Sequence, residues 1–392
     1  MKKTVLALYI VVIAVMAVAT MVERYEGTEY VAEHIYGAWW FTALWALLTA
    51  VAIFYFVKRR VRRLSVVTLH LSFVVILAGA LLTHLTARRG IVLLRKGEVT
   101  NQYLTRDMRL HSLPFSITLE DFEIEYYEGT NEPSDYISHI TIGQRPFTIS
   151  MNQIVSQRGI RLYQSDYDED LQGSILAMNS DPWGIPVTYC GYGLLFLSLL
   201  WILVDPRGRF REQVSALRSH RFPLVLLAAF LLACLVVLVI HFLRKYALST
   251  HPLPVLNSPL LPIHVSTIMM AYVLLLLTVV CSFVALAVKK KRQVMYHLSQ
   301  LMLYPSLTLL GFGIFIGAIW ANISWGNYWS WDPKEVWALI TFMVYAVAVH
   351  QRSFPLLRKP LAYHLYVTLA YLTILMTYFG VNYLLGGMHS YA

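Results

Sequence analysis

Cysteine and charge are scarce in this sequence, and each scarcity excludes a class of protein. Three cysteines occur in 392 residues, Cys190, Cys234 and Cys281, each inside an apolar run and none in a C-x-x-C pair. We expect them to be buried packing residues, so the chain has neither a disulfide framework nor a dithiol catalyst. Charged residues make up 14% of the chain and hydrophobic residues 57%, a balance that excludes an ordinary soluble domain.

The sequence contains long apolar runs with few charged residues. Nine runs approach the roughly 20 residues that a spanning helix needs, at about 4–22, 39–57, 66–86, 184–204, 222–243, 264–288, 297–319, 335–350 and 363–385. They predict a polytopic α-helical membrane protein with about nine transmembrane helices. The first run has a basic start and an Ala-Val-Ala near its end, as in a signal peptide, but its length favours a retained helix.

The formal charge of +10 follows the predicted topology. Nineteen Lys and Arg lie before the first run or in the segments 58–63, 205–221, 289–292 and 351–360, whereas the alternate short segments carry four. Positive residues collect on the cytoplasmic side, so we expect a cytoplasmic N-terminus and an extracytoplasmic C-terminus. The charge therefore gives no reason to expect nucleic acid as a partner.

Residues 87–183 are the one long polar segment, and the charge count places them outside the membrane. Alternating stretches such as 116–119 and 122–126, separated by Gly and Pro, predict strands and turns. We expect a β-rich extracytoplasmic domain inserted between the third and fourth helices. The predicted parts are helices 1–3 in 1–86, the β-rich domain in 87–183, the fourth helix and a linker in 184–221, and a helical domain in 222–392.

A loop at 320–337, WANISWGNYWSWDPKEVW, holds five of the ten tryptophans, among them Trp320, Trp325, Trp329 and Trp331. Indole faces can stack on a large planar ligand, although tryptophan also gathers at membrane interfaces without further function. Asp332 is expected to cap the next helix, with Pro333 at its first position and a glutamate at its third as in a capping box.

WGNYWSWDPKE resembles the tryptophan-rich WWD signature of the CcsA/ResC proteins of cytochrome c maturation and, more distantly, the CcmC and CcmF types. LPFSITLEDFEIEYYEGTNEPSDYIS, RGIRLYQSDYDED and HLSFVVILAGA resemble the ResB/CcsB family. Together the resemblances cover most of the chain, ResB-like to about 205 and CcsA-like after it, as in the fused CcsBA synthases of maturation system II. The ResB-like extracytoplasmic part is shorter here than in the larger fused proteins.

Histidines provide candidate ligands for haem iron, which axial His commonly holds. His264 opens the sixth predicted span and His389 follows the ninth, both at the expected depth of the Trp loop, and the resemblance also assigns them as the outer haem ligands. Lys334, together with Arg244 and Lys245, could neutralise haem propionates, although positive residues at a membrane surface are common.

A second pair of histidines is expected near the cytoplasmic face. His350 ends the eighth predicted span, and His70 lies about 10 Å into the third. The resemblance again indicates both residues. His84 is an alternative to His70, since fourteen residues is close to four turns and places the two on one helix face. We expect His297 and His364, at cytoplasmic span starts, to be structural.

The resemblance implies cytochrome c biogenesis in a bacterial cytoplasmic (inner) membrane. Non-covalent haem b would move from His70 and His350 to the outer site, and an apocytochrome with a C-x-x-C-H motif would receive it through two thioether bonds, as in a holocytochrome c synthase. An extracytoplasmic thioredoxin-like reductant and membrane lipid are the other expected partners. One alternative is a haem carrier or exporter that serves a separate ligase. The other is a quinone- or lipid-handling protein whose Trp loop is an interfacial belt.

Overall fold

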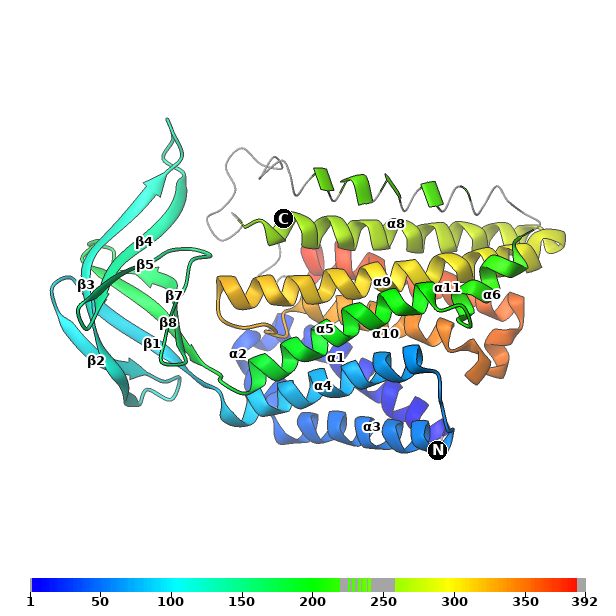
Figure 1. Ribbon diagram of the computed structural model, residues 1–392, viewed down its shortest axis with the longest axis horizontal. Helices are drawn as coiled ribbons and strands as arrows, with labels where there is room; N and C mark the ends of the chain where they lie inside the picture. The colour runs from blue at the N-terminus through cyan, green and yellow to red at the C-terminus, as the bar shows by residue number, and fades with distance from the viewer. Residues whose placement is uncertain are drawn as a thin grey trace.

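The computed structural model describes residues 2–218, ten positions between 225 and 240, and 258–385. Within these residues a helical bundle carries a β-sheet at one end (Figure 1). The long helices are α1 (Lys2–Glu26), α3 (Trp39–Lys58), α4 (Leu64–Thr86), α5 (Gly184–Val204), α8 (Leu260–Ala287), α9 (Arg292–Ser324), α10 (Pro333–Val349) and α11 (Pro360–Leu375), which continues as the π-helix η6 (Met376–Leu385).

Seven helices in the described parts of the chain are long and apolar enough to cross a membrane. Helix α10 is shorter, with 17 residues, or about 25 Å at 1.5 Å per residue. Eight of the nine predicted spans thus correspond to helices, and the fifth, 222–243, lies largely outside the described residues. The prediction of a polytopic helical membrane protein is confirmed.

Short helices connect the long ones. Between α1 and α3 the chain forms α2 (Thr28–Val31) and η1 (Ala32–Tyr36). At the other end of the bundle lie α6 (Arg209–Ala216), η3 (Lys289–Lys291), η4 (Gln351–Ser353) and η5 (Pro355–Arg358) (Figure 1). The basic segments of the sequence therefore gather at the end of the bundle that faces away from the sheet.

The polar segment forms one antiparallel sheet between α4 and α5, as predicted. Its strand order is β5-β4-β3-β2-β1-β8-β7-β6. The strands are β1 (Arg88–Arg95), β2 (Val99–Leu104), β3 (Leu110–Tyr126), β4 (Pro133–Ile142), β5 (Arg145–Ile149), β6 (Val155–Gln157), β7 (Ile160–Tyr167) and β8 (Gly173–Ser180). The stretches 116–119 and 122–126 both belong to β3, whose register against β4 shifts between Leu119 and Asp121.

The core of the sheet follows the two-residue period of a strand. Val92 and Leu94 on β1, Ile117 and Leu119 on β3, and Leu176 on β8 are at most 2% exposed, and they belong to one cluster. At the surface of the sheet the Lys96 ammonium lies 2.8 Å from Oδ1 of Asp121.

One prediction for the cysteines is wrong. Cys281 is buried on α8, as expected, but Cys190 on α5 is exposed. Its neighbours Gly191 and Tyr192 face the interior of the bundle, and the helical repeat turns Cys190 to the outside. Cys234 lies outside the described residues.

Candidate functional site

The Trp loop joins α9 to α10 and is fixed by the start of α10. Asp332 caps this helix through Oδ1, which accepts a hydrogen bond from the Lys334 amide at 2.9 Å, and Pro333 occupies the first helical position. The glutamate behaves differently from a capping box. Glu335 accepts a 3.0 Å hydrogen bond from the Ser330 amide, two residues before the cap, and so ties the loop itself to the helix.

Trp331 is held in a strained conformation inside an aromatic cluster. Its φ of 62° lies in the left-handed region, which is unfavourable for a bulky side chain. Its indole stacks on Tyr36 at a centroid distance of 4.6 Å and an interplanar angle of 9°, and meets the edge of Phe41 at 5.2 Å. Since Tyr36 and Phe41 come from the region around α2 and α3, these contacts anchor the loop to the N-terminal helices.

The tryptophans do not form one flat shelf. Trp320 and Trp325 meet at 70°, and Trp329 and Trp331 meet at 85°. Trp320 is 1% exposed, whereas Trp325, Trp329 and Trp331 are half-buried. The loop thus has two aromatic groups, one beside α8 and one beside α1 and α3.

His264 lies beside the first of these groups. Its ring is 6.4 Å from that of Trp320, and Nδ1 is 2.7 Å from the Gly313 carbonyl oxygen on α9. A Cβ on Gly317 would come within 2.5 Å of Cε1 of the imidazole. Glycine at 317 therefore makes room for His264 between two packed helices, as small residues do in membrane bundles. The sequence analysis missed this role, although the Gly-x-Gly-x-x-x-Gly spacing at 311–317 was a signal for it.

The sheet contacts the Trp loop directly. Asn179 on β8 donates a hydrogen bond to the carbonyl oxygen of Gly326, and Ser324 donates one to the side chain of Asn152. Gly326 has a φ of 80°, and a Cβ there would lie 2.7 Å from Cε2 of Tyr163 on β7. None of the sheet residues was a sequence candidate, because nothing in their local pattern indicates the loop.

A second contact connects the loop with the base of the sheet. The Tyr328 hydroxyl donates to Thr83 Oγ1 at 2.9 Å, and Thr83 donates to Asp181 Oδ2 at 2.6 Å. The other carboxylate oxygen of Asp181 accepts from the Gly184 amide at 2.8 Å, at the start of α5. A buried chain of hydrogen bonds thus connects the Trp loop, the end of α4 and the beginning of α5.

The structure brings His70 and His350 together. Their ring centroids are 5.9 Å apart, near the end of the bundle that faces away from the sheet. Nδ1 of His70 is 2.8 Å from the Val66 carbonyl oxygen, and Nδ1 of His350 is 2.7 Å from that of Ala346. Each Nδ1 thus donates to its own helix, which leaves Nε2 as the nitrogen available to a metal.

Three further candidate histidines in the described residues have different surroundings. His84 is exposed in the last turn of α4, toward the sheet, and so does not replace His70. His297 and His364 are hydrogen-bonded to protein, with Nδ1 of His297 2.8 Å from Gln213 Oε1 and Nδ1 of His364 2.9 Å from Ser282 Oγ. These contacts agree with a structural role for both.

Part of the predicted outer site lies beyond the described residues, namely His389, Arg244 and Lys245. Within them, Lys334 donates to Asn382 Oδ1 at 2.8 Å and so connects α10 to η6. Among the described residues no three or more His, Cys, Asp or Glu gather as they would around a metal ion. The described candidate histidines instead include one pair of imidazoles, a type of side chain that can hold haem iron at an axial position.

Comparison with known proteins identifies the family. The model of the cytochrome c assembly protein family matches residues 187–389, just over half of the chain. The chain belongs to the cytochrome c assembly family. A ResB-like family model matches residues 57–187, so this assembly protein is a fused ResB-like and CcsA-like chain of cytochrome c biogenesis.

Relatives of this assembly protein have matching names. This chain is 43% identical to the NrfI protein of Wolinella succinogenes over 120 residues, which are 29% of this chain and 13% of that protein. CcsA of Solanum lycopersicum is 49% identical over 84 residues, 21% of this chain and 26% of that protein. CcsA of Nymphaea alba is 29% identical over 244 residues, 53% of this chain and 77% of that protein. The chain thus spans about a quarter or less of the length of the first two.

The two histidines of the inner pair belong to different family matches. His70 on α4 lies in the ResB-like region, and His350 lies in the cytochrome c assembly region. The contacts of Tyr163 and Asn179 with Gly326 also connect these two regions. The inner histidine pair and the contacts between sheet and Trp loop therefore both join the two parts of the assembly protein.

Proposed function

We propose that this cytochrome c assembly protein receives haem b near the cytoplasmic face and presents it outside for covalent attachment to an apocytochrome c. His70 and His350 bind the iron at the inner site, and His264 and His389 bind it beside the Trp loop. The observation that supports this most directly is the inner pair, in which two helices from different family regions hold their imidazoles 5.9 Å apart.

The contribution of the chain at each site is orientation of ligands. Backbone carbonyls accept the Nδ1 protons of His70 and His350, so that each Nε2 keeps its lone pair for a metal. The Gly313 carbonyl oxygen accepts the Nδ1 proton of His264 and so orients that ring. Trp325 and Trp329, both half-buried, offer indole faces and edges to a porphyrin.

The ligation chemistry belongs to the two substrates. Haem supplies two vinyl groups, and the apocytochrome supplies the two thiols of its C-x-x-C-H motif. Each S–H bond breaks as a C–S bond forms, and the hydrogen goes to the neighbouring vinyl carbon, so attachment consumes no oxidant. The protein raises the rate by holding the two partners in position.

We further propose a bacterial cytoplasmic membrane location with the N-terminus inside and the sheet and C-terminus outside. The basic segments at the end of the bundle opposite the sheet support this orientation. A thioredoxin-like protein on the outer side keeps the thiols of the apocytochrome reduced.

The decisive experiment expresses the full chain with a reporter c-type apocytochrome in a host without its own maturation system. We expect covalent haem on the reporter and bis-His haem in the purified membrane protein. His350→Ala should empty both sites and stop attachment, whereas His84→Ala, on the same helix as His70, should change neither. Attachment that continued at its full rate in His350→Ala would refute the relay.

The alternative, a haem carrier that serves a separate ligase, predicts a different outcome in the same host. The membrane protein would bind haem at both sites while the reporter remained unmodified. Trp329→Ala tests the outer site in either case, because loss of a stacking partner weakens binding by about 1–3 kcal/mol, on the scale of base stacking.

A further inference from the structure

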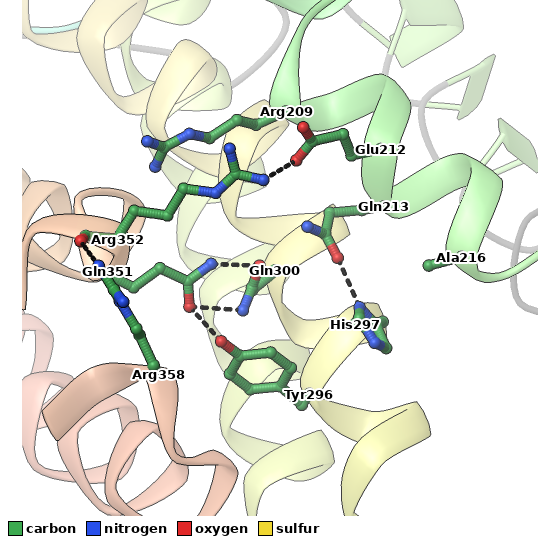
Figure 2. A pocket seen from close by; sticks show the side chains of 10 residues that line it. All are labelled: Arg209, Glu212, Gln213, Ala216, Tyr296, His297, Gln300, Gln351, Arg352 and Arg358. Atoms are coloured by element: carbon green, nitrogen blue, oxygen red, sulfur yellow. Dashed lines mark hydrogen bonds and ion pairs between the residues drawn. The ribbon is translucent and has the colours of Figure 1, made fainter. Parts of the chain in front are cut away.

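A basic pocket opens at the end of the bundle that faces away from the sheet. Its volume is about 470 Å³, in the range of roughly 300–1,000 Å³ that small-molecule sites occupy. Figure 2 shows its walls, which come from α6, the N-terminal part of α9 and the segment 351–358. The charged residues that line it are Arg209, Glu212, Arg352 and Arg358.

Most neutral polar groups of the pocket are hydrogen-bonded to one another. Gln300 and Gln351 exchange two hydrogen bonds through their side-chain amides, at 2.7 and 2.5 Å. The Tyr296 hydroxyl donates to the same Gln351 oxygen at 2.5 Å (Figure 2). Gln213 Oε1 lies 2.8 Å from Nδ1 of His297. These contacts make a rigid floor that has little capacity left to bind a neutral ligand.

The arginines retain donors that the protein does not use. Arg352 pairs with Glu212 at 2.7 Å, Arg209 donates to the Val349 carbonyl oxygen at 2.8 Å, and Arg358 donates to the Arg352 carbonyl oxygen. Each guanidinium has several N–H groups in a planar fork, so these contacts occupy a minority of them. Three arginines against one glutamate leave an excess positive charge, which selects an anion.

Two residues that line the pocket directly follow His350 in the chain. Arg209 holds the carbonyl of Val349, the residue before His350, and Gln351 and Arg352 come directly after it. A ligand with an anionic group in the pocket would therefore lie beside the segment that carries His350.

We infer that this pocket binds the carboxylates of haem, through Arg209 and Arg352, while His70 and His350 bind its iron. The inference rests on the proposed function and adds to it the orientation of the haem, with its carboxylate edge toward the cytoplasm. Arginine and a carboxylate form charge-assisted, often bidentate hydrogen bonds, and the pocket presents such forks beside the iron ligands. The same forks would accept the phosphate of a lipid headgroup or free phosphate.

The test compares haem with its dimethyl ester, which keeps the iron and lacks the negative charges. Purified full-length protein carrying His264→Ala, which removes an outer iron ligand, is placed in nanodiscs of zwitterionic lipid. It is titrated with each ligand, and binding at the inner site is followed by the Soret band. We expect Arg209→Gln and Arg352→Gln to weaken haem binding about tenfold or more and to leave ester binding unchanged, since charged hydrogen bonds are lost only with haem. Lys290→Gln, an exposed cation at the same end outside the pocket, is the control and should bind both ligands normally.

Glu212→Gln gives a result of opposite sign that misfolding cannot imitate. It removes the carboxylate that competes for Arg352, so haem should bind several-fold tighter and the ester should not. Equal losses for haem and ester in the arginine variants, or no tightening in Glu212→Gln, would overturn the inference. The inference would also fail if the arginine variants lost binding of inorganic phosphate or anionic lipid while their preference for haem over the ester was unchanged, because phosphate would then be the ligand.

His350→Gly separates this inference from the proposed function. If His350→Gly abolishes the Soret band with both ligands while the arginine variants behave as wild type, the inner haem site stands and the carboxylate pocket is wrong. If His350→Gly binds both ligands normally, the proposed inner site itself is wrong.

Discussion

Gly326→Ala should separate the sheet from the Trp loop. Gly326 has a φ of 80°, and an added Cβ would lie 2.7, 2.9 and 3.2 Å from three ring atoms of Tyr163. A left-handed alanine costs about 1–2 kcal/mol. Crowding against a packed ring adds about 1–3 kcal/mol, as overpacking does in protein cores. The contact should therefore weaken by about 2–5 kcal/mol.

The consequence should be confined to the outer site. The Gly326 carbonyl accepts a hydrogen bond from Asn179, so a displaced backbone loses this contact and gives the loop more freedom beside Trp325. The inner pair, at the other end of the bundle, does not depend on it. We expect purified Gly326→Ala to retain inner-site haem and to lose haem from the outer site.

The assay combines the haem spectrum with proteolysis of the junction between sheet and loop. Gly159→Ala is the matched control, because Gly159 also has a positive φ, 78°, and nothing lies within 4 Å of its added Cβ. Gly159→Ala therefore measures only the free-energy cost of placing alanine in a left-handed backbone conformation. Tyr163→Ala combined with Gly326→Ala should remove the steric part of the effect. If Gly326→Ala were no worse than Gly159→Ala, the sheet would not be positioning the loop.

Three further outcomes are expected. Gly317→Ala should displace the imidazole of His264, whose Cε1 would lie 2.5 Å from the new Cβ, and so change the outer-site haem spectrum with the inner one intact. Asp332→Ala should destabilise the start of α10 by about 1 kcal/mol in thermal unfolding, and Asp332→Asn by much less, because asparagine also caps. Hydrogen bonds from Lys96 and a backbone amide lower the pKa of Asp121, so its stabilising effect is present above its unfolded pKa of about 3.9 and is lost as pH falls through the lower folded pKa. Thermal unfolding at acid pH should therefore depend less on pH in Asp121→Asn, and an unchanged profile would contradict the assignment.

The sequence by itself determined the long helices, the β-rich segment and their order along the chain. Apolar runs of about twenty residues are enough to predict spanning helices, because a segment that crosses lipid must satisfy its own backbone hydrogen bonds. Period-two alternation gave the strands around Ile117 and Phe122, and Asp332-Pro333 gave the start of α10 to the residue. Each of these signals is local, and a local signal survives whatever the chain packs against.

Tertiary structure decided which side chains meet. Which turn of α4 faces which turn of α10 depends on helix rotation and offset, so only the packed bundle brings His70 rather than His84 to His350. Packing between segments also decides three other features. They are the exposure of Cys190, the contact of Gly317 with His264, and the hydrogen bond from Asn179 to the Trp loop. Each of these features depends on the distance between segments that are far apart in the chain. The periodicity of one segment carries no information about where another segment lies.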